Sequence, residues 1–275
     1  MQIRAGFEIA FEYPQPTAII FNFLLHPSRA ASLRGPERFR VDPPTAWSEY
    51  QDMHGNRCGR VFVPAGITTF HNDFTVEDGG MPDPQVWEAE QHEVQDLPHE
   101  ALVYLLPSRY CDSDSGLREA AKGLFYGSRM GWGRVQAICD YVHNHIRFDY
   151  MQARANRTAS ETYREAVGVC RDYTHLAIAF CRIMNIPARY CTGYLGDIGV
   201  PLTPPMDFSA WFEVYLGGQW RTFDARNNTP RIGRILIGIG RDAADVPLTT
   251  CFGMNRLAGF NVWTDEVRAA APIPA

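Results

Sequence analysis

The chain has 275 residues and a formal net charge of −5, with 45% hydrophobic and 21% charged residues. These values are ordinary for a globular protein and leave enough chain for one large domain or two modest ones. The acidic balance argues against a nucleic-acid-binding protein, which usually carries a basic excess. No apolar run is long enough for a membrane span, so we expect no membrane partner.

The cysteine pattern indicates neither a metal site nor a redox motif. The chain has seven cysteines and no C-x-x-C pair, so we expect no zinc site, no thioredoxin-like motif and no cofactor. An odd number of scattered cysteines is typical of a reducing compartment. Residues 3–13 alternate between apolar and polar side chains, which favours a strand over a signal peptide. The sequence therefore predicts a cytoplasmic protein.

The first part of the chain is predicted to be rich in strands. After the alternating segment 3–13, short apolar runs at 60–63 and 67–70 are separated by glycines and prolines. We therefore predict a β-rich N-terminal domain over residues 1–110.

Helical patterns begin after the polar junction at 112–116. Apolar residues at helical spacing predict a helix over 135–146 and a second one over 170–184, which Pro187 ends. Strand patterns return at 188–194, 210–216 and 220–225. The predicted class is α+β, with a core domain over 111–275 in which helices pack on an antiparallel sheet.

Two weaker signals lie near the C-terminal end. Five arginines fall between Arg221 and Arg241, and we interpret them as a solvated loop, with an anion-contacting surface as the alternative. Gly238 and Gly240 flank Ile239, and we interpret this glycine pair as a turn.

Cys170 is the main candidate for chemistry, because it stands where the second helix is expected to begin. Unpaired N–H groups and the helix dipole at this position stabilise a thiolate. Such an environment can lower a cysteine pKa from ~8.5 to roughly 3.5–7.5. Gly168 allows a tight turn into the helix and leaves room for a substrate carbonyl. The alternative, of equal weight from these residues alone, is an inert cysteine at the start of a core helix.

A predicted hairpin supplies two further candidates. Gly217 and Gly218 form a two-residue turn between apolar runs, and the resulting register places Trp211 opposite Asp224 and Ser209 opposite Arg226. Ser209, Trp211 and Asp224 then share one face, so Asp224 would orient a histidine at 209 toward Cys170. A strand-end turn carboxylate is the alternative for Asp224. Trp211 is a candidate for the substrate groove, although aromatic packing is the commoner role.

Three segments carry a family resemblance: 168–176 (GVCRDYTHL), 186–194 (IPARYCTGY) and 210–225 (AWFEVYLGGQWRTFDA). Their order and spacing resemble the core of the bacterial transglutaminase-like superfamily over residues 111–250. The β-rich start resembles the accessory domain that often precedes this core. The resemblance implies a papain-like core in which Cys170 is the nucleophile, position 209 the histidine and Asp224 the third member.

The chain departs from this pattern at the position of the general base, because residue 209 is a serine, Ser209, and not a histidine. All eight histidines lie at or before His175, so a small shift of register cannot supply one. Loss of a positioned acid–base group typically costs ~10²–10⁴-fold in rate. Four interpretations remain open: a relative that binds without turnover, a deliberately altered sequence, a histidine such as His143 or His145 entering from elsewhere, or slow chemistry by a helix-start thiolate alone. His175 is expected to face away from Cys170.

These observations predict an acyl-transfer enzyme that acts on a peptide or protein amide through a Cys170 thioester. Hydrolysis is favoured over cross-linking, because the sequence shows no calcium site and bacterial members of the resembled family are often proteases or amidases. The backbone N–H of Cys170 is expected to be one oxyanion donor. The alternative function is a non-catalytic binding protein that keeps the groove. The sequence specifies neither the substrate nor the oligomeric state.

Overall fold

The computed structural model describes residues 1–203 and 205–267. The helices are α1 His99–Leu102, α2 Leu117–Phe125, α3 Trp132–His145, α4 Ala159–Glu165 and α5 Cys170–Ile183. The N-terminal strands are β1 Gln2–Tyr13, β2 Thr17–Phe21, β3 Arg40–Asp42, β4 Trp47–Gln51, β5 Arg57–Val63 and β6 Gly66–Glu77. The later strands are β7 Arg147–Phe148, β8 Val167–Gly168, β9 Ala188–Leu195, β10 Phe208–Leu216, β11 Gln219–Phe223, β12 Arg234–Gly240, β13 Thr249–Cys251 and β14 Arg256–Glu266.

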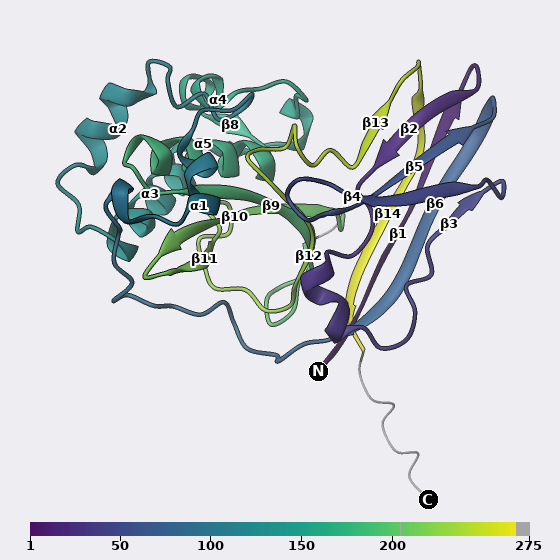
Figure 1. The fold of residues 1–275 in the computed structure, drawn as a ribbon, viewed down its shortest axis with the longest axis horizontal. Helices are drawn as coiled ribbons and strands as arrows, with labels where there is room; N and C mark the ends of the chain where they lie inside the picture. The colour runs from purple at the N-terminus through teal and green to yellow at the C-terminus, as the bar shows by residue number, and fades with distance from the viewer. Residues whose placement is uncertain (204, 268–275) are drawn as a thin grey trace, which may run out of the picture.

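The N-terminal strands form two facing sheets, with strand orders β14-β1-β6-β3 and β13-β2-β5-β4. Along β1, alternate residues are buried, and the ring of Phe7 lies 4.5 Å from that of Phe23 between the sheets. The period-two pattern of residues 3–13 therefore produces one face of a sandwich core. Figure 1 shows this sandwich to the right of the helices. The predicted β-rich N-terminal region is confirmed.

The last two described strands belong to these same sheets. Strand β14 pairs with β1 from Ile3↔Glu266 to Glu12↔Arg256, and β13 pairs with β2. In Figure 1 the yellow β14 accordingly lies beside the purple β1. The domain boundary expected near residue 110 stays a prediction. Strands β13 and β14 complete the two sheets of the N-terminal sandwich.

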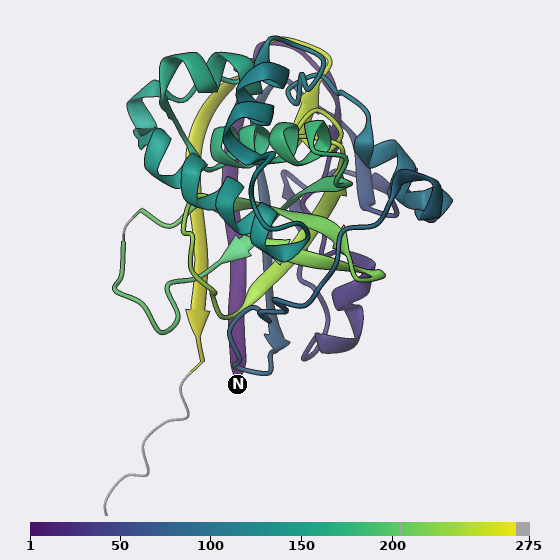
Figure 2. The same ribbon diagram turned by 90° about the vertical axis from the view of Figure 1, so that its left-hand side faces the viewer.

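The second unit is a four-stranded antiparallel sheet, β11-β10-β9-β12, with helices on one face. Helix α5 packs on the face of β10 that carries Ala210, Phe212 and Val214, and α2, α3 and α4 pack around α5. Figure 2, viewed from the helical side, shows these helices in front of the sandwich strands. The predicted α+β architecture is confirmed. Among the described residues, no helix combines the length and apolar character needed to cross a membrane.

The glycine pair near the C-terminal end is part of strand β12, so the turn expected there is wrong. The register of β12 on β9 shifts between Leu236 and Gly238. A Cβ atom on Gly238 would lie 3.1 Å from Val246 Cγ1. Gly238 therefore marks a bulge with a close neighbour, which is a common use of glycine inside a strand.

Candidate active site

The turn before α5 is held by a buried carboxylate. Asp172 Oδ2 accepts hydrogen bonds from the backbone N–H of Val169 at 2.9 Å and from Arg157 Nη1 at 3.0 Å. A Cβ atom on Gly168 would lie 2.6 Å from the Asp172 side chain. Glycine at 168 is therefore required for Asp172 to fix the position of Cys170, the first residue of α5.

Cys170 lies in a cavity of about 420 Å³ between the helical unit and the sandwich. The start of α5, the start of β10 and the segment 243–249 line this cavity, and Tyr110 and Tyr190 add aromatic surface. Its volume lies within the range of small-ligand sites. Gly168 and Trp211, which the sequence suggested as groove residues, do not line this cavity among the described residues.

The Cys170 thiol is not activated by its position at the helix start. Burial, and to a lesser extent the charge of Asp207, raise the pKa of the thiol, which lies at about 11. The guanidinium of Arg226 and the N–H groups of Ala210 and Arg171 lower the pKa, but they do not outweigh burial. The thiol is therefore protonated at neutral pH.

Ser209 lies in the same cavity as Cys170, on strand β10. Its side chain is buried, and its Oγ has no hydrogen-bond partner among the described residues. Ser209 also lines an adjacent cavity of about 360 Å³. The residue at the expected histidine position thus lines the same cavity as Cys170, and its hydroxyl has no hydrogen-bond partner among the described residues.

The hairpin has the register that the sequence indicated. The β10–β11 pairing runs from Leu216↔Gln219 to Phe212↔Phe223, and it ends one pair before Trp211 and Asp224. Asp224 therefore lies just beyond the ladder, in the turn that follows β11.

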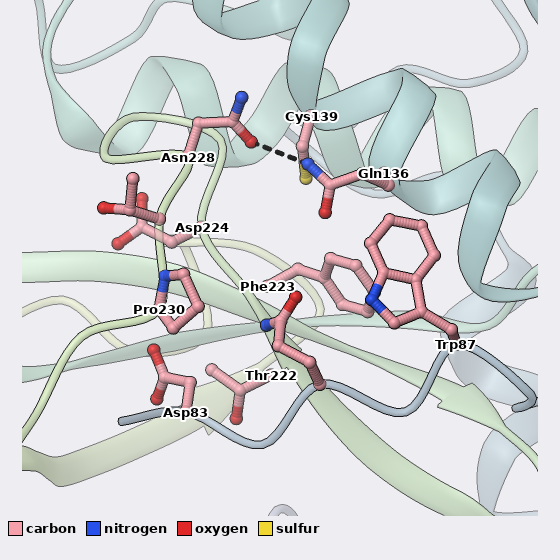
Figure 3. A pocket seen from close by; sticks show the side chains of 11 residues that line it. Asp83, Trp87, Gln136, Cys139, Thr222, Phe223, Asp224, Asn228 and Pro230 are labelled. Carbon is pink, nitrogen blue, oxygen red and sulfur yellow. Dashed lines mark hydrogen bonds between the residues drawn. The ribbon is translucent and has the colours of Figure 1, made fainter. Parts of the chain in front are cut away.

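Asp224 forms its hydrogen bonds with residues that do not line the Cys170 cavity. Its Oδ1 accepts from the N–H groups of Arg226 and Asn227, and its Oδ2 accepts from Arg234 Nη2 at 3.0 Å. Arg234 and Asn227 lower the pKa of Asp224 against the effect of burial, so this carboxylate is ionised at neutral pH. It lines a separate cavity of about 240 Å³, shown in Figure 3 with Asp83 and the Gln136–Asn228 hydrogen bond.

Arg234 connects Asp224 with Trp211. The guanidinium carbon of Arg234 lies 5.2 Å from the Trp211 ring centroid, and its Nε donates to Asp83. Trp211 itself is buried against Cys191 and Ile239. The structure therefore gives Trp211 a packing role beside a buried ion pair.

The five arginines between Arg221 and Arg241 do not all lie on the surface. The interpretation of this segment as a solvated loop is wrong for two of them. The side chains of Arg231 and Arg234 are each 8% exposed. Arg231 pairs with Asp197, and Arg234 pairs with Asp83 and Asp224. Buried arginines of this kind require carboxylate partners, which come from distant parts of the chain.

No histidine replaces the missing base among the residues that line the two cavities. His143 Nδ1 lies 2.9 Å from the carbonyl oxygen of Arg226, and His145 Nε2 lies 2.7 Å from that of Tyr163. His175 Nε2 accepts from the N–H of Ala243 at 3.1 Å. Burial keeps the pKa of His175 far below its ordinary value, so this ring is neutral and lies behind the cavity wall.

Two residues of the site were not among the sequence candidates. Asp207 lines both cavities, and its Oδ1 accepts from the N–H of Phe208 at 2.7 Å. Arg226 lines the second cavity, with its guanidinium carbon 4.2 Å from the Phe148 ring centroid. Both had a signal in the sequence, since Asp207 precedes Ser209 by two residues and the hairpin register places Arg226 opposite Ser209. Among the described residues, no cluster of histidine, cysteine and carboxylate side chains could hold a metal ion.

Comparison with known proteins identifies the fold family. Residues 118–225 match the family model of the transglutaminase-like superfamily. The crystal structure of a candidate cysteine protease from Cytophaga hutchinsonii aligns with a TM-score of 0.84 and 30% identity, over 98% of this chain and 92% of that chain. The chain belongs to the transglutaminase-like superfamily.

Uncharacterized mycobacterial proteins are further relatives of this transglutaminase-like chain. One from Mycobacterium leprae is 33% identical over 131 residues, which is 45% of this chain and 47% of that protein. One from Mycobacterium tuberculosis is 29% identical over 243 residues, which is 76% of this chain and 73% of that protein. The resemblance found in the three sequence motifs is confirmed.

Proposed function

We propose that the chain is a transglutaminase-like cysteine enzyme that cleaves or transfers an amide bond of a peptide or protein through a Cys170 thioester. The observation that carries this proposal is that Cys170, at the start of α5, and Ser209, at the expected histidine position, line one cavity of ligand size. The Cytophaga relative, described as a candidate cysteine protease, supports the same reaction class. We further propose a cytoplasmic location.

The proposed reaction begins with attack of the Cys170 sulfur on the substrate carbonyl carbon. The backbone N–H of Cys170 is the proposed donor to the oxyanion, and collapse of the intermediate releases the amine and leaves a thioester. In a complete triad an imidazole carries the proton between the thiol and the leaving amine. Ser209 cannot do so near neutral pH, so we expect turnover lower than that of a complete triad by ~10²–10⁴-fold.

Replacing Ser209 with histidine tests the proposal. We expect Ser209→His to raise cleavage of fluorescein-labelled casein at least 10-fold, because an imidazole at this position can accept the thiol proton. The added activity should disappear in the double variant Cys170→Ala, Ser209→His. If Ser209→His folds with an unchanged melting temperature and shows no added activity that depends on Cys170, the proposed proton transfer between position 209 and Cys170 is wrong.

The raised pKa of the Cys170 thiol favours a second candidate, a protein that keeps the groove and binds without turnover. Incubation with 4-nitrophenyl acetate separates the two, because this ester has a leaving group that needs no proton. An enzyme of the proposed kind forms an acetyl thioester on Cys170 and then hydrolyses it, as intact-mass spectrometry can follow. A binding protein leaves Cys170 unmodified at neutral pH.

A further inference from the structure

The start of β10 places a second polar side chain at the nucleophile. Asp207 and Ser209 are two residues apart in the chain, and both line the cavity that contains Cys170 as well as the adjacent one. Asp207 has no salt bridge within 4.0 Å among the described residues, although Arg226 lines the same second cavity. Asp207 is therefore a carboxylate that lines the cavity and forms no close ion pair among the described residues.

The charge of Asp207 influences the Cys170 thiol. It is one of the groups that raise the pKa of the Cys170 thiol, which requires the carboxylate to lie within electrostatic range of the sulfur. A carboxylate that lines the same cavity as a protonated thiol can accept its proton, whereas the Ser209 hydroxyl is not basic. The two other residues of the expected triad do not offer this function, since Asp224 is bound to Arg234.

We propose that Asp207 is the general base of this site and carries the proton that a histidine at 209 would otherwise carry. This inference rests on the proposed Cys170 thioester and assigns its proton transfers. The carboxylate lies two residues before the expected histidine position, directly before strand β10.

In the first step the Cys170 S–H proton moves to an Asp207 carboxylate oxygen while the sulfur bonds to the substrate carbonyl carbon. The intermediate collapses, the C–N bond breaks, and the leaving amine takes that proton from Asp207. In the second step Asp207 accepts a proton from water as the water oxygen bonds to the thioester carbon. The C–S bond then breaks, and the departing sulfur takes the proton, which restores the thiol and the carboxylate.

The surroundings of Asp207 suit it to this task. Burial raises the pKa of Asp207, which makes its carboxylate a stronger base than an exposed one. The N–H of Phe208 and the guanidinium of Arg226 lower the pKa and so keep the ionised form accessible. Tyr150 and Cys170 are the other titratable groups close enough to interact with these charges. Arg171, Tyr110 and Tyr190 line the first cavity, and Asp197 and Arg231 pair with each other in the second.

The variant Asp207→Asn distinguishes base catalysis from a simple charge effect. Loss of the charge should make Cys170 more reactive, whereas loss of the base should make the thioester hydrolyse more slowly. Removal of the negative charge lowers the pKa of the Cys170 thiol, so alkylation of Cys170 by iodoacetamide at pH 8 should become faster. Removal of the base should slow hydrolysis of the acetyl-Cys170 thioester formed with 4-nitrophenyl acetate. We expect the half-life of this thioester at pH 7, followed by intact-mass spectrometry, to lengthen by about 10²-fold.

The matched control is Glu213→Gln, which removes a carboxylate from strand β10 at a position paired with Arg189. This control should leave the thioester half-life unchanged. Asp207→Glu keeps a carboxylate and should restore hydrolysis to within about tenfold of the wild-type rate. In the wild-type chain the hydrolysis rate should rise with pH as Asp207 ionises, and this rise should be absent in Asp207→Asn.

The proposal is overturned if acetyl-Cys170 forms in Asp207→Asn and its half-life lengthens less than tenfold, or if Glu213→Gln lengthens it equally. A wild-type chain that forms no acetyl adduct on Cys170 contradicts the proposed function itself, and the inference falls with it. The two failures are therefore distinguishable by whether the adduct appears.

Discussion

The Cys170 thiol shows how two local effects compete at one residue. A helix start favours a thiolate by placing N–H groups near the sulfur, but those groups act only weakly on a sulfur that burial keeps neutral. In a complete triad the imidazolium stabilises the thiolate, and no histidine lines the cavity among the described residues. The candidate nucleophile is therefore positioned without being charged.

The raised pKa of the Cys170 thiol predicts how the rate of its alkylation depends on pH. With a thiol pKa of about 11, the rate of iodoacetamide labelling should rise about tenfold per pH unit between pH 7 and pH 10, because only the thiolate reacts. In Ser209→His the rise should level off at a lower pH, since an imidazolium would stabilise the thiolate. Peptide mass spectrometry of Cys170 across the pH range measures both profiles. A wild-type profile that levels off near pH 8.5 would contradict the burial argument.

At the scale of elements, the predictable parts of the fold were the ones specified by neighbouring residues. Helix α5 follows from an apolar stripe, and the β10–β11 register follows from the turn at Gly217 and Gly218. The pairing of β14 with β1 and the burial of Arg234 could not be predicted in the same way. Both depend on residues far apart in the chain, and a single sequence contains no periodicity that reports such contacts.

The candidate site likewise has parts that could be predicted from the sequence and parts that depend on contacts between distant residues. The sequence placed Cys170 and Ser209 at one site, and the structure brings them into one cavity. It did not indicate that Asp224 is bound to Arg234, because the position of Arg234 depends on pairing between β12 and β9. Asp207 was missed because a carboxylate just before a strand is more often an ordinary turn residue.

The start of α5 gives a prediction about stability. Gly168→Ala should lower the free energy of unfolding by about 2 kcal/mol, because the added methyl group would displace Asp172 from Val169 and Arg157. Urea unfolding followed by circular dichroism measures the change. Gly79→Ala is the matched control, since a Cβ atom there meets nothing within 4 Å. An equal loss in both variants would show that the close contact with Asp172 is not the cause.

At the scale of the whole molecule, the sandwich and the helical unit are joined by a buried amide. Asn56 Nδ2 donates to the carbonyl oxygen of Ile239 at 2.7 Å, and its Oδ1 accepts from the N–H of Ile239 at 2.8 Å. Asn56 is fully buried, and nearby His54 Nε2 lies 3.2 Å from Asp245 Oδ2. These contacts anchor the β4–β5 turn to the end of β12, beside the segment that lines the Cys170 cavity.

Removing this amide should weaken the whole molecule. We expect Asn56→Ala to lower the free energy of unfolding by about 3 kcal/mol, because both backbone groups of Ile239 would be left buried without partners. Thermal and urea unfolding measure the effect, with Asn255→Ala in the exposed β13–β14 turn as the control. A loss below about 1 kcal/mol would show that water or a local shift replaces the amide.

The pairing of β1 with β14 has a consequence for the order of events on the ribosome. Strand β1 is made before the other strands described here, whereas its partner along nearly its whole length is made after them. The residues between α2 and β12 can fold while translation continues, whereas one edge of β1 stays open until β14 emerges. A chain that lacks residues 256–266 would therefore carry the elements of the core domain and a strand β1 with one open edge, and such an edge is a natural target for chaperones.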